Sequence, residues 1–222
     1  MQISEHTQCF AVLGHPVAHT LSPPMHNAAL GEMDLDGVYL PYDVLPEDLL
    51  SVLESMGKMG FGGVNLTIPH KEVAFRGLDR LDASAKLVGA VNTVQFTDSG
   101  MVGHSTDGYG ILMAIEEAFG APIDGQSIAV IGCGGAGRSI ALVCATSGAR
   151  GITLWNRNRD RARVLNEEIA RVAPDVLVNV VEDDEGVIAE ADIVIQATSL
   201  GMKPEDAPRA SSRFLRPRRW YR

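Results

Sequence analysis

The stretch "VIGCGGAGRS" (residues 130–139) decides the fold class expected for this chain. Gly132, Gly134 and Gly137 keep G-x-G-x-x-G spacing between an apolar segment typical of a buried strand and a segment typical of a helix. The first glycine permits a tight turn, the second lets a pyrophosphate approach the backbone, and the third lets the helix pack on the strand. The helix N-terminus adds N–H donors for an anion. The stretch therefore predicts a dinucleotide-binding βαβ unit.

The end of the next strand indicates which dinucleotide binds. The predicted strand 151–155 is followed by Asn156, Arg157 and Asn158, with Arg159 and Arg161 beyond them. An NAD site places Asp or Glu here for the ribose 2′-hydroxyl, whereas a guanidinium suits a 2′-phosphate by charge and bidentate geometry. We therefore predict NADP as the cofactor. The alternative is that these arginines are only the solvated start of a helix.

Working outward, the rest of the chain alternates predicted strands and helices. Upstream, we expect strands at 9–13, 38–44 and 63–67, helices from Ser22 or Pro23 and over 46–56, and a hairpin turning at 98–100. Downstream, we expect helices at 108–120, 137–146 and 159–171 and strands at 127–131, 151–155, 176–181 and 192–198. Such alternation predicts an α/β protein with mostly parallel sheets. We expect a substrate-binding catalytic domain over 1–107 and a Rossmann-like dinucleotide-binding domain over 108–202, followed by an atypical basic tail, 203–222.

Composition narrows the class of partner. The formal net charge of −9 over 222 residues argues against nucleic acid, which requires a basic surface. The 3 cysteines lack metal-ligand spacing and read as reduced thiols of a cytoplasmic protein, and the 6 scattered histidines suggest no metal site. We find neither a signal peptide pattern nor an apolar run long enough for a membrane span. We therefore expect a small-molecule substrate, with a monomer and a homodimer both open.

A second stretch, "NLTIPHK" (residues 65–71), raises a question about Lys71. A lysine near a turn is ordinarily a solvated surface charge. Only partners elsewhere in the chain can give it a chemical role.

A resemblance to a known family indicates such partners. The blocks "GHPVAHTLSPPMHN", "NLTIPHK", "GAVNTV", "GHSTDGYG", "GCGGAGRS", "NRNRDRA" and "QATSLGM" stand in the order typical of the shikimate dehydrogenase family. The resemblance implies NADPH-dependent reduction of 3-dehydroshikimate to shikimate in aromatic amino-acid biosynthesis. Relatives oxidise quinate, sometimes with NAD.

The resemblance also implies roles for individual residues. Lys71 and Asp107 would form the catalytic pair, and which of them carries the proton stays open. Further residues expected at the substrate are Thr20 and Ser22 at its carboxylate, and Asn65, Thr67 and Asn92 at its hydroxyls. Cofactor contacts are expected from Gly132, Gly134, Gly135, Ala136, Gly137, Asn156, Arg157, Arg161, Thr198 and Met202. Without the family, Asn65 and Asn92 read as turn or strand-end residues and Ser22 as a helix cap.

The chain departs from the family pattern in two ways. Thr20, Ser105, Asn158 and Gln196 replace the usual residues, which leaves the preference for shikimate or quinate open. After about Met202 the family pattern is lost, so we expect a truncated nucleotide domain, no strand in the tail, an unpaired edge at 192–198 and weak or absent turnover. The alternatives are a non-catalytic remnant that binds the dinucleotide or the substrate, and a quinate or methylene-tetrahydrofolate enzyme on the same scaffold.

Overall fold

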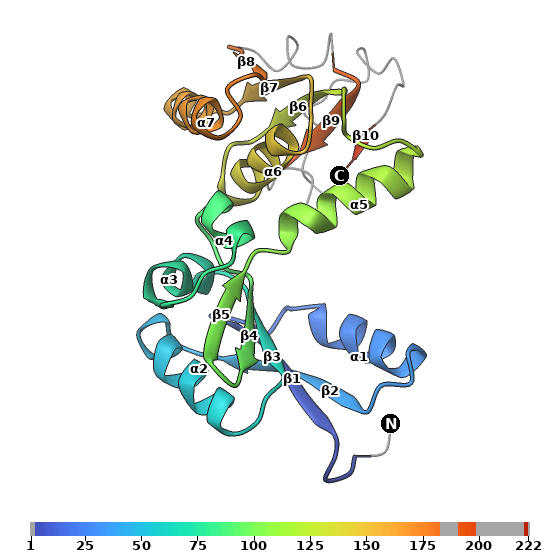
Figure 1. Cartoon of the computed structure of the whole chain (residues 1–222), viewed down its shortest axis with the longest axis vertical. Coiled ribbons are helices and arrows are strands. Elements are labelled where there is room, and N and C mark those ends of the chain that lie inside the picture. Colours follow the sequence, from blue (N-terminus) through green and yellow to red (C-terminus); the bar gives the residue numbers. More distant parts are fainter. Residues whose placement is uncertain (1–2, 183–190, 199–219, 222) are drawn as a thin grey trace. The chain divides into compact units, whose positions relative to one another are not determined.

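The computed structural model describes residues 3–182, 191–198 and 220–221 of the chain. Met202 and almost all of the expected basic tail lie outside the described residues. The chain divides into two compact units, Met1–Thr106 and Asp107–Arg222. Each unit is an α/β structure built on its own sheet (Figure 1).

The first unit has alternating strands and helices followed by a hairpin. Its elements are β1 (Gln8–Gly14), α1 (Ser22–Glu32), β2 (Gly37–Asp43), the 3-10 turn η1 (Pro46–Asp48), α2 (Leu49–Lys58), β3 (Gly63–Leu66), α3 (His70–Gly77), α4 (Ala83–Val88), β4 (Thr93–Thr97) and β5 (Gly100–His104). The hairpin β4–β5 turns where the sequence predicts it. Helices α3 and α4 are short and were not expected.

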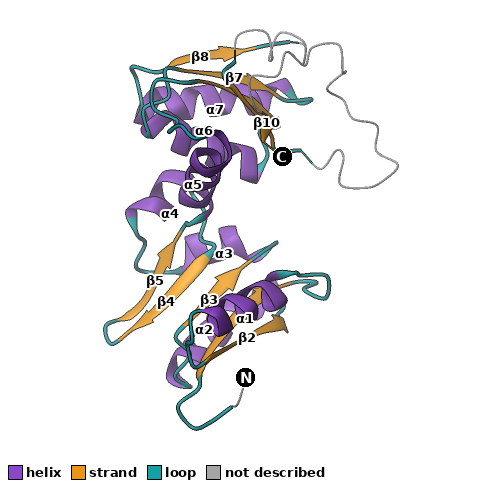
Figure 2. Cartoon of the chain, turned by 90° about the vertical axis from the view of Figure 1, so that its right-hand side faces the viewer, coloured by secondary structure: helices purple, strands orange, loops and turns teal. Residues whose placement is uncertain are grey.

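The first sheet has the strand order β2-β1-β3-β4-β5. β1 pairs in parallel with β2 and β3, and β4 runs antiparallel to both β3 and β5. On one face, apolar side chains of the sheet form a core with α2 and α3, including Leu13, Leu53, Leu66 and Ala74. On the other face, α1 covers a smaller cluster around Val12 and Tyr39 (Figures 1 and 2).

The second unit is a parallel sheet. Its elements are α5 (Asp107–Phe119), β6 (Ser127–Ile131), α6 (Gly135–Thr146), β7 (Gly151–Trp155), α7 (Arg159–Val172), β8 (Leu177–Val180), β9 (Ile193–Gln196) and β10 (Trp220–Tyr221). Helix α5 precedes the first strand, and α6 and α7 connect the next strands in turn. The strand order is β10-β9-β6-β7-β8, and every pair is parallel. No helix in the described ranges is long and apolar enough to cross a membrane.

The second sheet corrects one expectation about the tail. Trp220 and Tyr221 pair in parallel with Val194 and Ile195, so β9 is not left as an edge by the described residues. The expectation of a tail without a strand was wrong. Alternating polarity did not reveal it because a strand of 2 residues is too short to show a period.

Candidate active site

The predicted substrate residues of the first unit gather at one edge of its sheet. The carboxyl ends of the parallel strands β1 and β3 lie beside the start of β4, because β4 runs the other way. Asn65 therefore pairs with Thr93, and Thr93 pairs with His104 at the end of β5. These polar residues are neighbours because β4 runs antiparallel to β3, so the start of β4 lies beside the end of β3.

Asn65 and Asn92 are joined by a network of hydrogen bonds. The Asn65 Nδ2 atom donates to Thr93 Oγ1 (3.0 Å) and lies 3.4 Å from the Asn92 carbonyl oxygen. Thr93 Oγ1 in turn donates to Asn92 Oδ1 (3.1 Å), which also accepts from the Thr106 backbone N–H (2.9 Å). Each amide is therefore held in a fixed orientation at the edge of the sheet, as a site for substrate hydroxyls would require.

Lys71 lies in the first turn of α3, immediately after the buried His70. Its carbonyl oxygen accepts a hydrogen bond from the Val91 N–H (3.0 Å), which ties this turn to the segment carrying Asn92. Its side chain is half-buried. Asp107, the expected partner, opens α5 in the second unit and is exposed. The catalytic role of the two residues stays a prediction.

The other expected substrate residues follow β1 and β3. The Ser22 N–H donates to Thr20 Oγ1 (3.2 Å) at the start of α1, and the Thr67 N–H donates to the Leu13 carbonyl oxygen (2.9 Å). Ser22 is not the helix cap: Leu21 takes that position, without a side-chain cap. Pro23 and Pro24 follow Ser22, and proline suits the first turn because it lacks the N–H that a cap would satisfy.

A pocket of about 410 Å³ opens on the α1 side of the first sheet. Asn65 lines it, together with residues that the sequence interpretation did not select: Phe10, His26, Leu30, Tyr39, Gly62, Gly63, Val64, Thr93, Val94, Gln95, His104 and Thr106. Thr93 and Thr106 directly follow Asn92 and Ser105 in the blocks "GAVNTV" and "GHSTDGYG", so their place in these blocks could have indicated them. Tyr39 carried no such signal.

His70 is a titratable side chain in an apolar position. It is 0% exposed, and neither ring nitrogen has a hydrogen-bond partner within the described part of the chain. Desolvation lowers the pKa of His70 below its ordinary value, with a further lowering from His15 and an opposing effect of Asp43 and of the nearby Val44 and Gly14 backbone. The His15 Nδ1 atom lies 2.6 Å from Asp43 Oδ1, and that hydrogen bond lowers the pKa of Asp43.

The lowered pKa of His70 predicts a pH-dependent stability. As pH falls through about 6.5, the unfolded chain takes up the proton before the folded chain does, so the folded state loses stability toward acid and keeps it above that pH. We expect the unfolding temperature to fall by a few degrees between about pH 7.5 and 5.5. The variant His70→Phe should show a smaller fall, and His6→Gln, an exposed control, the wild-type fall. Equal falls in all three proteins would contradict this account.

In the second unit, the Gly-rich turn has the backbone that a bound pyrophosphate requires. Gly132 has φ +102°, and a Cβ on Gly137 would overlap the Gly132 carbonyl oxygen. Helix α6 begins at Gly135, two residues before the predicted start, with Gly134 at an N-cap that has no side-chain hydrogen bond. The space around Gly134 and Gly135 is open, so an anion could reach the N–H groups of the first turn.

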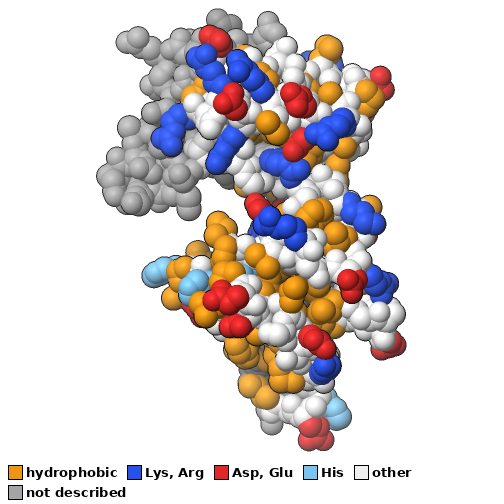
Figure 3. Space-filling view, turned by 90° about the vertical axis from the view of Figure 1, so that its left-hand side faces the viewer, with side chains coloured by type: hydrophobic (Ala, Val, Ile, Leu, Met, Phe, Trp, Pro, Cys, Tyr) orange, Lys and Arg blue, Asp and Glu red, His pale blue; other side chains and the backbone are white. Residues whose placement is uncertain are grey.

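Asn156, after β7, and Thr198, after β9, lie beside this turn. Asn156 Oδ1 accepts from the Cys133 N–H (2.9 Å), and Thr198 lies so close to Gly132 that a Cβ there would meet its Cγ2 atom at 2.6 Å. Arg157 and Arg161 are exposed, and within the described ranges neither forms an ion pair. Figure 3 shows basic side chains spread over this unit. Arg159, in contrast, pairs with Glu182 (3.1 Å).

The second unit also holds a buried polar atom, Gln196 Oε1, without a hydrogen-bond partner among the described residues. Gln196, at the end of β9, pairs with Ile131 just before the Gly-rich turn. A buried acceptor of this kind calls for a donor from a ligand or from water. Together with the open turn, it fits a nucleotide at the carboxyl ends of β6 and β9.

The parallel sheet, the glycine turn and the open helix N-terminus define a dinucleotide-binding α/β protein. The other unit carries a network of hydrogen-bonded amide and hydroxyl side chains, of which Asn65 and Thr93 line its pocket. Comparisons with known proteins identify the family of both units. Residues 12–94 match the family model of the shikimate dehydrogenase substrate binding domain, and residues 114–203 match that of shikimate / quinate 5-dehydrogenase. The chain belongs to the shikimate dehydrogenase family.

Individual relatives cover most of the chain. The shikimate dehydrogenase (NADP(+)) of Methanothermobacter thermautotrophicus is 38% identical over 216 residues, 96% of this chain and 76% of the relative. The shikimate 5-dehydrogenase of Listeria monocytogenes, solved with shikimate and NAD, has a TM-score of 0.85 at 35% identity, covering 94% of this chain and 74% of that one. The Thermus thermophilus enzyme, solved with NADP(H) and shikimate, has a TM-score of 0.77 at 39% identity, covering 90% and 72%.

Proposed function

We propose that this chain catalyses the NADP-dependent, reversible reduction of 3-dehydroshikimate to shikimate. The observation that carries the proposal is the attachment of the Lys71 turn to the segment bearing Asn92, whose amide is held in one network with Asn65. A proton-transfer group thus lies in the same part of the fold as two oriented hydroxyl-binding amides. Relatives named shikimate dehydrogenase (NADP(+)) support the assignment. The reaction serves aromatic amino-acid biosynthesis.

The mechanism requires that a proton and a hydride leave the same alcohol group. NADP⁺, when bound at the glycine turn, supplies the hydride acceptor. Lys71 and Asp107 take up the hydroxyl proton during oxidation and return it during reduction. Asn65, Thr67 and Asn92 hold the hydroxyls, and Thr20 and Ser22 meet the carboxylate. Neutral donors in these positions orient the substrate without competing for the proton.

The proposal assigns substrate binding and catalysis to residues 1–107 and dinucleotide binding to 108–202. Gly132, Gly134, Gly135, Ala136 and Gly137 cradle the pyrophosphate, and Asn156, Arg157, Arg161, Thr198 and Met202 complete the cofactor contacts. We propose a cytoplasmic enzyme, acting as a monomer or homodimer on a small molecule. The free thiols of Cys9, Cys133 and Cys144 suit that location.

Cofactor choice depends on Arg157 and Arg161. The double variant Arg157→Ala, Arg161→Ala should raise the Kd for NADP⁺ by about 10- to 100-fold, because charge-assisted hydrogen bonds to a 2′-phosphate are lost. The Kd for NAD⁺ should change little. Titration of both nucleotides, followed by protein fluorescence, measures the effect.

The matched control for cofactor choice is Arg163→Ala, on the same helix, whose guanidinium lies 3.5 Å from Asp160. It should bind NADP⁺ as the wild type does. Equal losses for both nucleotides in the double variant, or none, would show that these arginines do not recognise the 2′-phosphate.

Substrate choice between shikimate and quinate is tested by initial rates. With NADP⁺, the wild-type chain should use shikimate with a higher kcat/KM than quinate, and with NAD⁺ both rates should be lower. A quinate preference would make the chain a quinate dehydrogenase of the same family. Nucleotide binding without turnover of either acid would favour the non-catalytic alternative.

A further inference from the structure

Tyr39, on the edge strand β2, contacts the proposed substrate site through its hydroxyl. Its side chain is 4% exposed, and its Oη atom donates to Asn65 Oδ1 at 2.7 Å. Burial raises the pKa of Tyr39 to about 12, so the phenol stays protonated and able to donate at any pH at which the enzyme works. None of the roles proposed above uses this residue.

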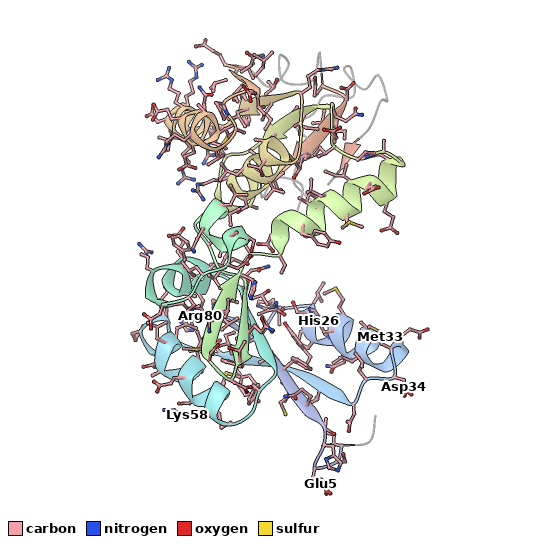
Figure 4. All side chains as sticks on the ribbon, viewed as in Figure 1. Glu5, His26, Met33, Asp34, Lys58 and Arg80 are labelled. Carbon is pink, nitrogen blue, oxygen red and sulfur yellow. The ribbon has the colours of Figure 1, made fainter. Side chains whose placement is uncertain are left out.

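The position of Tyr39 is fixed from two sides by helix α1. Asn27 donates from Nδ2 to the Tyr39 carbonyl (2.8 Å) and accepts at Oδ1 from the Tyr39 N–H (2.9 Å). The His26 ring stacks on the Tyr39 ring with centroids 4.3 Å apart and planes at 15°. Figure 4 labels His26 on α1. Because β2 is an edge strand, Asn27 satisfies backbone groups that have no neighbouring strand. The tyrosine hydroxyl is therefore presented to Asn65 from a rigid support.

The Asn65 amide has a reason to keep one orientation. Its Oδ1 atom faces the Tyr39 hydroxyl, and its Nδ2 atom faces Thr93 Oγ1 and the Asn92 carbonyl. A flipped amide would place two oxygens, Asn65 Oδ1 and the Asn92 carbonyl, 3.4 Å apart with no proton between them. Without the Tyr39 hydroxyl, Oδ1 would lose its donor, and the amide could rotate toward the pocket.

We propose that Tyr39 is a positioning residue, which locks the Asn65 amide in one orientation and so sets the preference for a hydroxylated acid. The inference rests on the proposed function, since it takes Asn65 as a contact of a substrate hydroxyl. The hydrogen bonds continue from Asn65 to Thr93 and from Thr93 to Asn92, so the Tyr39 hydroxyl is the first donor of a connected series that reaches Asn92. Tyr39 acts on the substrate through Asn65.

The variant Tyr39→Phe tests this role and keeps the packed ring. We expect the KM for shikimate to rise about tenfold, as loss of one hydrogen bond predicts, with kcat within about twofold of wild type. The kcat/KM advantage of shikimate over analogues lacking one ring hydroxyl should shrink. Tyr42→Phe, on the same strand, is the matched control, because its hydroxyl has no hydrogen bond in the described part of the chain. It should behave as the wild type.

Two further measurements separate positioning from a general structural effect. In an Asn65→Ala background, Tyr39→Phe should leave the KM almost unchanged, because the group through which it acts is gone. In ¹⁵N spectra, the Asn65 side-chain amide signals should shift in Tyr39→Phe and stay in place in Tyr42→Phe. An unchanged KM with unchanged amide signals, or an equal KM increase in the Asn65→Ala background, would overturn the proposal.

Failure of the proposed function has a different appearance. A folded wild-type chain that turns over no polyol acid would remove that function, and with it the preference assigned to Tyr39. The amide spectra would then still decide whether Tyr39 orients Asn65.

Discussion

Replacing Lys71 with alanine is expected to lower kcat for shikimate oxidation by about 10²- to 10⁴-fold, the usual contribution of a positioned acid–base group. NADP⁺ affinity should stay as in the wild type, because the glycine turn belongs to the other unit. The KM for shikimate should change less than kcat, since an interaction with the reacting oxygen strengthens as its proton leaves. Initial rates of NADPH formation over a range of shikimate concentrations measure kcat and KM, and nucleotide titration measures the affinity.

The matched control for this change is Lys86→Ala, an exposed lysine on α4 of the same unit. It removes the same charge and should retain wild-type kcat. If Lys71→Ala kept more than about a tenth of the wild-type kcat while remaining folded, Lys71 would be an ordinary surface lysine.

Gly137→Ala is expected to have the second large effect, on the dinucleotide unit. The new Cβ atom would overlap the Gly132 carbonyl oxygen, a backbone atom directly after β6, while Gly137 itself lies within α6. The helix must move away from the strand, which we expect to cost about 3 kcal/mol of stability and to raise the Kd for NADP⁺ by about 100-fold. Thermal unfolding and nucleotide titration measure the two effects separately.

Gly110→Ala is the control for the glycine change, because a Cβ there meets nothing within 4 Å. This residue lies inside α5, where alanine should stabilise the unit by about 0.5–1 kcal/mol. Wild-type stability and NADP⁺ binding in Gly137→Ala would mean that the close approach of helix and strand is not required.

The nucleotide half of the fold could be predicted closely from sequence. The strands 127–131 and 151–155 have their predicted bounds, because each is a short apolar run with turn residues on both sides. The start of α6 was placed two residues late, since glycine has low helix propensity and tertiary packing overrides it here. The G-x-G-x-x-G turn lies between a strand and a helix as predicted, because the motif stands between an apolar run and a helical segment in the sequence.

Helices α3 and α4 could not be predicted because neither has enough length for a helical period to show. α3 has 8 residues and follows Pro69 directly, and α4 has 6. Lys71 was therefore placed near a turn, whereas it lies on the first turn of a helix. A propensity argument does not find such helices, because packing of buried residues such as Ala74 and Ala85 stabilises them.

In the candidate site, some residues can be predicted from sequence and others cannot. Asn65, Asn92 and Lys71 stand in recognisable blocks, so the sequence indicates them. The Tyr39 contact depends on which strands are neighbours and in which register, since it joins residues 26 positions apart on strands separated by β1. Strand register is a tertiary property that a single sequence does not reveal.

The most direct test of the central claim is the reduction of NADP⁺ by shikimate in the presence of the purified 222-residue chain. Absorbance measures NADPH, and chromatography measures 3-dehydroshikimate. The account predicts equal amounts of the two products and no reaction when shikimate is omitted. A folded chain that binds NADP⁺ but forms neither product would contradict the assignment of this chain as an NADP-dependent shikimate dehydrogenase.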